Sequence, residues 1–255
     1  MFKKNVDLIL KQISPTDRVL DIGGWVQPFN RANYVIDIMP YETRGFFGSL
    51  GPEKESFSKE SWIIQDVSGS APLPFQDKEI DFVFCSHLLE DIRDPIRLCS
   101  EIVRIGKRGY IEVPSRVAES IMGLEGRSYT GYGNHRWLVQ IQGSEIIFQH
   151  RTPILYNSAQ FYLPRKYLQR LKEEDKVSFL FWEGSFEYKE IIHIGYHNIA
   201  QELERFARSK IALPFPVILM QNLKKIGKAI KDRIWARSVD RTDDFWKDLP
   251  DIESR

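Results

Sequence analysis

The chain has 255 residues, of which 42% are hydrophobic and 28% are charged, and its formal net charge is +1. This composition is ordinary for a globular protein, and the length suits one large α/β domain with a modest extension or two small domains. A net charge so close to zero gives no strong field that would steer the chain to nucleic acid or to an acidic surface. Only two cysteines are present, Cys85 and Cys99, which argues against a disulfide framework.

The sequence shows no sign of secretion or of a membrane span. Residues 1–18 contain no apolar core long enough for a signal peptide. No segment reaches the roughly 18 apolar residues that a membrane-spanning helix needs. We therefore expect a protein of the reducing cytoplasm.

The first half of the chain alternates between strand and crossover patterns. Apolar spacing predicts a short amphipathic helix over residues 3–13 and a second helix over 95–105. Short apolar runs bounded by turn residues predict five buried strands, at 18–21, 34–38, 62–66, 81–85 and 109–113. Residues 42–60 are rich in glycine and lack periodicity, so we expect a loop there. Strands joined by such crossovers imply a mostly parallel sheet.

The second half of the chain has a different pattern. Residues 135–150 and 176–194 each predict an antiparallel hairpin, and a helix is expected around Leu203 and Ala207. The predicted fold class is α/β, a Rossmann-like, mostly parallel sheet with antiparallel hairpin additions and a C-terminal helical extension. We expect a main domain over residues 1–198, in which 123–160 form an insertion that covers the substrate, followed by a helical extension over 199–255.

The stretch VLDIGGWVQPFNRANYVIDI, residues 19–38, opens like a nucleotide-binding strand and then departs from that pattern. Asp21 ends an apolar run and is followed by Gly23 and Gly24, but the third glycine of a dinucleotide-binding loop is missing. Pro28 stands where a phosphate-binding helix would be under way. The ligand therefore need not carry phosphate.

Polar side chains follow four of the predicted strands. Asp21, Asp37, Asp66 and the pair Ser86-His87 all lie at or just after a strand end. In open α/β sheets, ligands bind outside the carboxyl ends of the strands. A carboxylate after the second strand suits ribose hydroxyls, and Asp66 could accept from an exocyclic amine. These features describe a cationic nucleoside without phosphate, and S-adenosylmethionine is such a molecule.

The order of the motifs carries a family resemblance. The run VLDIGG, VIDI, QDVSG, LPFQDKEIDFVFCSHLLEDIRDP and EIVRIGKRGYIEVPS resembles class I S-adenosylmethionine-dependent methyltransferases over residues 17–115. The similarity is greatest to the broad group whose fourth strand runs into an H-x-x-E-H segment. By this resemblance, Asp21, Gly23 and Gly24 form the first cofactor loop beside the methionine moiety, while Ser86 and His87 line the methionine and sulfonium side.

The resemblance also assigns the adenosine half of the cofactor. Asp37 would bind the ribose hydroxyls, and Ile38 would pack on the adenine. Asp66 would meet the adenine amine, and Val67 would offer a backbone amide.

Two departures from the family pattern concern the cofactor loop and the segment after the fourth strand. The usual glycine-rich loop is shortened, so that Trp25 or Gln27 could fill the space of the third glycine. Asp91 stands where the family often has its second histidine, which weakens a catalytic role at that position.

Several of these residues also have a purely structural interpretation that involves no ligand. Asp21 and its glycines could be a plain exit from a strand, and Asp37 could cap a turn. His87 could hydrogen-bond within the wall of the site without taking part in chemistry. Glu90 is expected to begin a helix and to favour its N-terminus.

His135 is the candidate catalytic residue. It lies in the glycine-punctuated segment GYGNHRWLV after the fifth strand, where loops cover the acceptor in this fold by analogy. The alternative is a structural packing corner, and Tyr132 is a second candidate contact to the substrate. No set of His, Cys and carboxylate residues has convincing metal-ligand spacing, so no metal is expected.

Residues 217–237 predict a basic amphipathic helix, with an apolar stripe that includes Leu223 and Ile230 and lysines and arginines around it. The helix could pack on the domain with a solvated basic face. It could also contact a membrane surface or a protein partner, and the protein would then be peripheral to the membrane.

The sequence therefore predicts an S-adenosylmethionine-dependent methyltransferase that acts on a small-molecule or glycan acceptor, at an oxygen. A nucleic-acid methyltransferase is an alternative, disfavoured by the near-zero charge and by the lack of an N/D-P-P-Y/F motif after the fourth strand. A non-catalytic subunit of the same fold is a second alternative, which could have lost the cofactor pocket.

Overall fold

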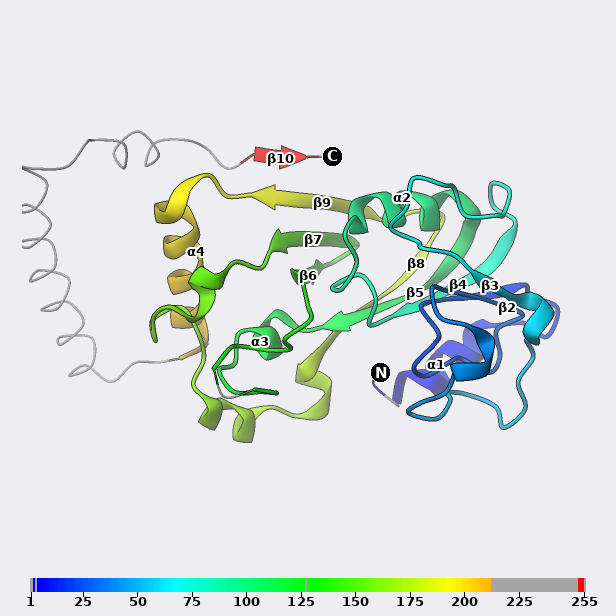
Figure 1. Ribbon diagram of the computed structural model, residues 1–255, viewed down its shortest axis with the longest axis horizontal. Coiled ribbons are helices and arrows are strands. Elements are labelled where there is room, and N and C mark those ends of the chain that lie inside the picture. The colour runs from blue at the N-terminus through cyan, green and yellow to red at the C-terminus, as the bar shows by residue number, and fades with distance from the viewer. Residues whose placement is uncertain (1, 3, 127, 212–251, 255) are drawn as a thin grey trace, which may run out of the picture.

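The main sheet places its strands where the sequence predicted them (Figure 1). The computed structural model describes residues 2, 4–126, 128–211 and 252–254. The parallel strands are β1 (Val19–Ile22), β2 (Tyr34–Asp37), β3 (Trp62–Ile64), β4 (Ile80–Ser86) and β5 (Gly106–Pro114). They lie in the order β3-β2-β1-β4-β5, and β8 (Val177–Glu183) adds an antiparallel strand beside β5. The Rossmann-like α/β class is confirmed.

The two predicted helices of the first half cover opposite faces of this sheet. Side chains alternate along a strand, so Leu20 and Val19 point to different faces. Leu20 belongs to the core that α2 (Pro95–Ile105) covers, and Val19 to the core that α1 (Lys4–Gln12) covers. Figure 1 shows α1 and α2 on either side of the strands.

The connections around β2 contain no α-helix in the described chain. Residues 23–33 are turns and extended segments, and residues 38–61 add only two short 3-10 turns, Tyr41–Thr43 and Lys59–Ser61. Buried Phe29 and Leu50, which also form a parallel bridge, cover the sheet face instead of a helix. The carboxyl ends of β1 and β2 therefore border loops rather than helix N-termini.

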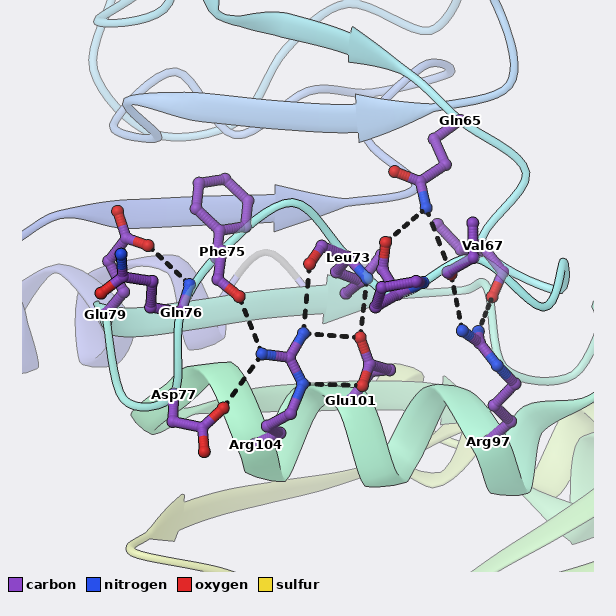
Figure 2. Close-up of polar contacts among 12 residues, drawn as sticks. Gln65, Val67, Leu73, Phe75, Gln76, Asp77, Glu79, Arg97, Glu101 and Arg104 are labelled. Atoms are coloured by element: carbon purple, nitrogen blue, oxygen red, sulfur yellow. Dashed lines mark hydrogen bonds and ion pairs between the residues drawn. The ribbon is translucent and has the colours of Figure 1, made fainter.

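Side chains of α2 fix the connector that follows β3 (Figure 2). Arg104 donates to the backbone carbonyls of Phe75 at 2.7 Å and Leu73 at 3.1 Å. Glu101 accepts from the Leu73 backbone N–H at 2.7 Å and also pairs with Arg104. Arg97 donates to carbonyls of the turn over residues 67–71. The connector and its LPF motif are thus held by charged contacts to the helix that follows them.

A second, smaller sheet has the order β10-β9-β7-β6. The predicted hairpin over 135–150 is confirmed as β6 (Trp137–Gln142) and β7 (Glu145–His150). Parallel to β7 lies β9 (Glu187–Ile192), and β10 (Ile252–Ser254) pairs with β9. Trp137 and Phe148 join the core under α2, so this sheet closes one face of the main sheet.

The second predicted hairpin, over 176–194, is wrong. Its two strands lie in different sheets, because β8 pairs along its whole length with β5 while β9 pairs with β7. At the bend between them, Gly184 adopts a φ of +73°, a conformation that favours glycine. Trp182 and Phe186 on either side are buried in the same core. Burial of these aromatic side chains favours the switch between sheets over a simple hairpin.

The predicted helix around Leu203 forms as α4 (Gly195–Lys210), and a single turn of helix, α3 (Arg116–Glu119), follows β5. The predicted basic helix over 217–237 lies outside the described residues. Within the described ranges, no helix is long and apolar enough to cross a membrane.

Candidate active site

A cavity of about 270 Å³ opens at the carboxyl ends of β1 and β4. Its wall contains five of the predicted cofactor residues: Asp21, Gly23, Gly24, Ser86 and His87. The remaining lining residues come from the loops that replace crossover helices: Val26, Gln27, Phe47 and Leu50, with Phe84 from β4. The crevice thus lies at the strand ends where the sequence predicted a ligand.

Asp21 holds the loop that forms this cavity. Its side chain is 1% exposed, and Oδ2 accepts a hydrogen bond of 2.8 Å from the backbone N–H of Phe29. Burial raises the pKa of Asp21 to about 7, and the nearby charge of Asp37 adds to the rise. A Cβ atom on Gly24 would lie 2.3 Å from Asp21 Oδ2, so only glycine fits there. The glycine turn and the buried carboxyl group therefore form one structural unit.

Asp37 lies at the end of β2 and is only half-buried. Its Oδ1 accepts from the Met39 N–H at 2.9 Å, and its Oδ2 accepts from the Trp25 N–H at 3.1 Å. Burial raises the pKa of Asp37, and these backbone donors oppose the rise. Each carboxylate oxygen has further lone pairs, which leaves acceptor capacity for hydroxyl groups.

Trp25 does not line the cavity. Its indole Nε1 donates to the Thr43 backbone carbonyl at 2.9 Å. Gln27, the other residue proposed for the third-glycine space, does line the cavity and donates from Nε2 to the Phe47 carbonyl at 3.1 Å.

The predicted adenosine residues do not line the 270 Å³ cavity. Ile38 is 65% exposed, and Ile64 at the matching end of β3 is 63% exposed, so two aliphatic side chains face solvent at adjacent strand ends. Asp66 is exposed, and its Oδ1 accepts from the Ser68 N–H at 2.8 Å. Val67 is buried in the core under α2. The roles of Asp37, Ile38, Asp66 and Val67 stay predictions, and Ile64 is an addition that the sequence analysis missed.

His87 is held in a strained conformation between two buried carboxylates. Its φ is +54°, an unusual value for a residue other than glycine. Nε2 lies 3.1 Å from Glu112 Oε1, and Nδ1 lies 3.3 Å from Glu90 Oε1. Burial lowers the pKa of His87, but the two carboxylates outweigh it and raise the pKa to about 9. These two carboxylates favour the imidazolium form at neutral pH: Nε2 is hydrogen-bonded to Glu112, whereas Glu90, whose buried oxygens accept no hydrogen bond, lies within ion-pair distance of Nδ1.

Glu112 is the centre of this network, and the sequence analysis missed it. It lies in β5, is 1% exposed, and accepts from the Tyr110 hydroxyl at 2.5 Å and from the Phe2 backbone N–H at 2.9 Å. Burial raises the pKa of Glu112, but His87 and Tyr110 outweigh it, so the pKa lies below its usual value. A glutamate inside the apolar strand GYIEVP was the available signal, because a buried carboxylate needs partners.

The prediction that Glu90 begins a helix is wrong. Residues 88–93 form turns, and α2 begins at Pro95 after the capping residue Asp94. Glu90 is 1% exposed instead, beside His87.

His135 lies in a buried corner. Its side chain is 8% exposed, and Nδ1 is 2.6 Å from Glu119 Oε1. Burial lowers the pKa of His135, but Glu119 more than compensates and the pKa is raised. The Tyr132 ring covers it at a centroid distance of 4.7 Å. Asp91 Oδ1 lies 3.8 Å from His135 Nε2, and burial raises the pKa of Asp91 to about 6.

A second cavity, of about 440 Å³, begins on the other side of His87. It is lined by residues from four separate segments: Phe2, Lys4, His87, Tyr132, Glu173, Lys176 and Val177. His87 is the residue that the two cavities share. Tyr132 belongs to the predicted acceptor-covering insertion, whereas the β6–β7 strands of that insertion pack in the core.

Within the described residues, no group of three or more His, Cys, Asp or Glu side chains could hold a metal ion. Both cysteines, Cys85 and Cys99, are free and buried, as expected for small core residues.

Comparison with known proteins finds one matching family model and several similar solved structures. Residues 36–111, which run from β2 into β5, match the family model described as a methyltransferase domain. Similar solved structures include an S-adenosylmethionine-dependent methyltransferase from Mesorhizobium loti, with 14% sequence identity, coverage of 58% of this chain and 63% of that chain, and a TM-score of 0.34. One from Methanosarcina mazei has 19% identity, coverage of 43% of this chain and 57% of that chain, and a TM-score of 0.32. One from Aquifex aeolicus has 16% identity, coverage of 44% of this chain and 65% of that chain, and a TM-score of 0.29. This chain thus spans less than two thirds of each of those chains. No curated protein matches it.

Proposed function

We propose that this chain, which matches a methyltransferase-domain family model over residues 36–111, binds S-adenosylmethionine across the carboxyl ends of β1, β2 and β4 and transfers its methyl group to an oxygen of a small-molecule or glycan acceptor. The observation that carries the proposal is the 270 Å³ cavity, in which a bare glycine turn faces Ser86 and His87. No helix N-terminus points into the β1 turn in the described chain, so the turn does not suit a pyrophosphate.

The proposal extends from this cavity to the neighbouring strand ends. Asp37 would accept from the ribose hydroxyls with its remaining lone pairs, because an ionised carboxylate accepts strongly from O–H donors. The exposed side chains of Ile38 and Ile64 would cover one face of the adenine, and Asp66 would accept from its amine. The hydrogen bonds from Arg97 to the turn over residues 67–71 would hold this end of the site in place.

The protein's part in the reaction is mainly alignment. The cofactor would supply a methyl group already activated by the sulfonium charge. The residues at the two cavities would hold donor and acceptor in line, and such positioning contributes about 7–11 kcal/mol in well-oriented reactions. His87, with the buried carboxylates Glu112 and Glu90 behind it, would form the wall between the two reactants.

A hydroxyl acceptor would require a general base, and His135 is the proposed base. A general base contributes around 10²- to 10⁴-fold, and the His135–Glu119 pair has the composition of such a base. To reach an acceptor in the second cavity, the His135 ring would have to act around Tyr132, which lines that cavity. With a hydroxyl acceptor, we expect His135→Ala to lower turnover by at least about tenfold while the affinity for S-adenosylmethionine stays nearly unchanged.

Because the ring is buried, His135→Ala could also disturb folding, and His135→Gln is the second variant. Glutamine can keep a hydrogen bond to Glu119 but cannot accept a proton as a base. Wild-type turnover in His135→Gln would remove the catalytic role and leave a packing role.

Calorimetric titration tests the proposed cofactor. The chain should bind S-adenosylmethionine and S-adenosylhomocysteine, and it should not bind NAD. Asp37→Asn should weaken binding by about 10- to 150-fold, the equivalent of 1.5–3 kcal/mol for hydrogen bonds to a charged group. Asp77→Asn is the matched control, because Asp77 is 80% exposed and pairs with Arg104 far from the ribose position.

The remaining expectations belong to the same proposal. Release of S-adenosylhomocysteine with candidate acceptors would establish catalysis, whereas cofactor binding without turnover of any acceptor would favour a non-catalytic subunit. A cytoplasmic location, and a membrane or protein contact through residues 217–237, stay predictions that cell fractionation would test.

A further inference from the structure

The 440 Å³ cavity beyond His87 offers positive charge and an apolar wall. Phe2, Tyr132 and Val177 supply the apolar part, and the ammonium groups of Lys4 and Lys176 supply charge. Glu173 is the carboxylate residue in this lining, and it is already paired with Lys176 at 2.6 Å and mostly exposed. An acceptor with an anionic group on an apolar body would match this wall.

His87 adds a third cation, fixed at the boundary with the cofactor cavity. Glu112 and Glu90, which hold its ring nitrogens at 3.1 and 3.3 Å, do not line the second cavity. The carboxylates thus lie behind the ring, while the ring itself lines both cavities. An imidazolium carries a proton on both ring nitrogens and therefore has no lone pair with which to remove another proton.

The described lining therefore offers cations and no unpaired base. A neutral hydroxyl that entered this cavity would meet one carboxylate, Glu173, which is already paired with Lys176, while His135 lies behind Tyr132. An oxygen that is already ionised needs no base. Its negative charge would be attracted to Lys4 and, more weakly, to Lys176 and His87, whose charges are offset by Glu173 and by Glu112 and Glu90.

From this geometry we infer that the 440 Å³ cavity is the acceptor site and that it takes a carboxylate on an apolar or aromatic body, which the enzyme converts to a methyl ester. The inference rests on the proposed function. In the reaction, a carboxylate oxygen forms a bond to the methyl carbon as the carbon–sulfur bond breaks. The sulfur keeps that electron pair and leaves as a neutral thioether, and no proton is transferred.

Fragment binding to the full-length chain tests the inference. Benzoate and benzamide have nearly the same size and shape and differ in charge, and both would be titrated in the presence of S-adenosylhomocysteine. The NMR signals of the Val177 methyl groups report on the cavity. We expect benzoate to bind at about 1 mM or tighter and benzamide at least about tenfold more weakly.

Lysine variants test which side chains cause the preference for benzoate over benzamide. Lys4→Gln and Lys176→Gln should reduce the preference for benzoate, whereas Lys172→Gln should retain it. Lys172 is the matched control, because it is 77% exposed, lies four residues from Lys176 and does not line the cavity. Equal binding of the two fragments, or no shift of Val177 with either at about 10 mM, would overturn the inference.

The protonation state of His87 is a second measurement. Nitrogen chemical shifts of the ring should show both nitrogens protonated at neutral pH, and a neutral ring would overturn the argument that the cavity lacks a base. Titration of S-adenosylmethionine in the same samples distinguishes a wrong acceptor class from a wrong proposed function. If the cofactor binds and benzoate does not, the acceptor class is wrong; if the cofactor does not bind, the proposed function is wrong.

Discussion

The two cavities that meet at His87 are built from contacts of different range. Around the cofactor cavity, Asp21 and Asp37 accept hydrogen bonds from backbone groups at most twelve residues away. The second cavity gathers Phe2, Tyr132 and Val177, which are far apart in the chain, and Glu112 ties the first of them to the sheet. A site made by local turns depends on its own residues, whereas a site made by distant segments depends on the buried group that connects them.

The largest expected effect comes from removing that connecting group. Glu112→Ala would leave the His87 imidazolium without its main partner and the Tyr110 hydroxyl and Phe2 N–H without an acceptor. Breaking a buried charged pair in this way lowers the free energy of unfolding by about 3–5 kcal/mol. Urea denaturation measures the loss, and Glu112→Gln, which keeps an acceptor oxygen, should lose less. An unchanged stability in Glu112→Ala would contradict the connecting role.

Asp21, in the wall of the cofactor cavity, should make the free energy of unfolding depend on pH. Its folded-state pKa of about 7 lies above the unfolded value of about 3.9, so the folded state binds the proton more tightly. The stability that Asp21 contributes is complete below about pH 4 and is lost as the pH rises through about 7, by about 4 kcal/mol at most. Asp21→Asn should therefore flatten the decline in unfolding free energy between these pH values. An identical decline in wild type and variant would show that Asp21 titrates normally.

Gly24→Ala tests the close packing of the glycine turn. The added methyl group would lie 2.3 Å from Asp21 Oδ2, and such overpacking costs about 1–3 kcal/mol of stability. Because the turn forms the cavity wall, the affinity for S-adenosylmethionine should fall as well. Gly143→Ala in the β6–β7 turn is the control: it has a φ of +62° and open space around it, so it should lose stability through the backbone alone and retain binding. If Gly24→Ala and Gly143→Ala weakened binding equally, the contact between residue 24 and Asp21 would not be the cause.

The smallest expected effect concerns the connector after β3. Arg104→Ala removes the hydrogen bonds to the Leu73 and Phe75 carbonyls, and we expect a loss of about 1–2 kcal/mol in unfolding free energy. Lys107→Ala, which removes an exposed pair with Asp81, should cost about 0–1 kcal/mol. A scan of thermal stability compares the two. Equal losses would mean that the connector does not depend on α2.

Much of the fold could be predicted because it rests on local patterns. Apolar runs located the five parallel strands, and helical spacing located α1 and α2 within a residue or two. The pairing of β8 and β9 could not be predicted in this way. A hairpin and a pair of strands in two sheets have the same local pattern, and only the free edge of β5 and the shared aromatic core distinguish them.

The candidate site divides in the same way. Asp21, Gly23, Gly24, Ser86 and His87 stand next to strand ends in the sequence, and the structure brings them to one cavity. Glu112 and Lys176 carried no motif, because their surroundings come from segments far away in the chain. The role of Glu90 was misjudged because a carboxylate that begins a helix and one buried beside a histidine look alike in sequence.

The sequence by itself determined the five strands of a mostly parallel sheet, the glycine turn that lacks a phosphate-binding pattern and the carboxylates at the strand ends, since these depend on neighbours along the chain. Only the tertiary structure decided that His87 stands as a cation between two cavities. That arrangement depends on Glu112 in β5 and Glu90 after β4 being buried together, and burial without water is what forces such charges to pair.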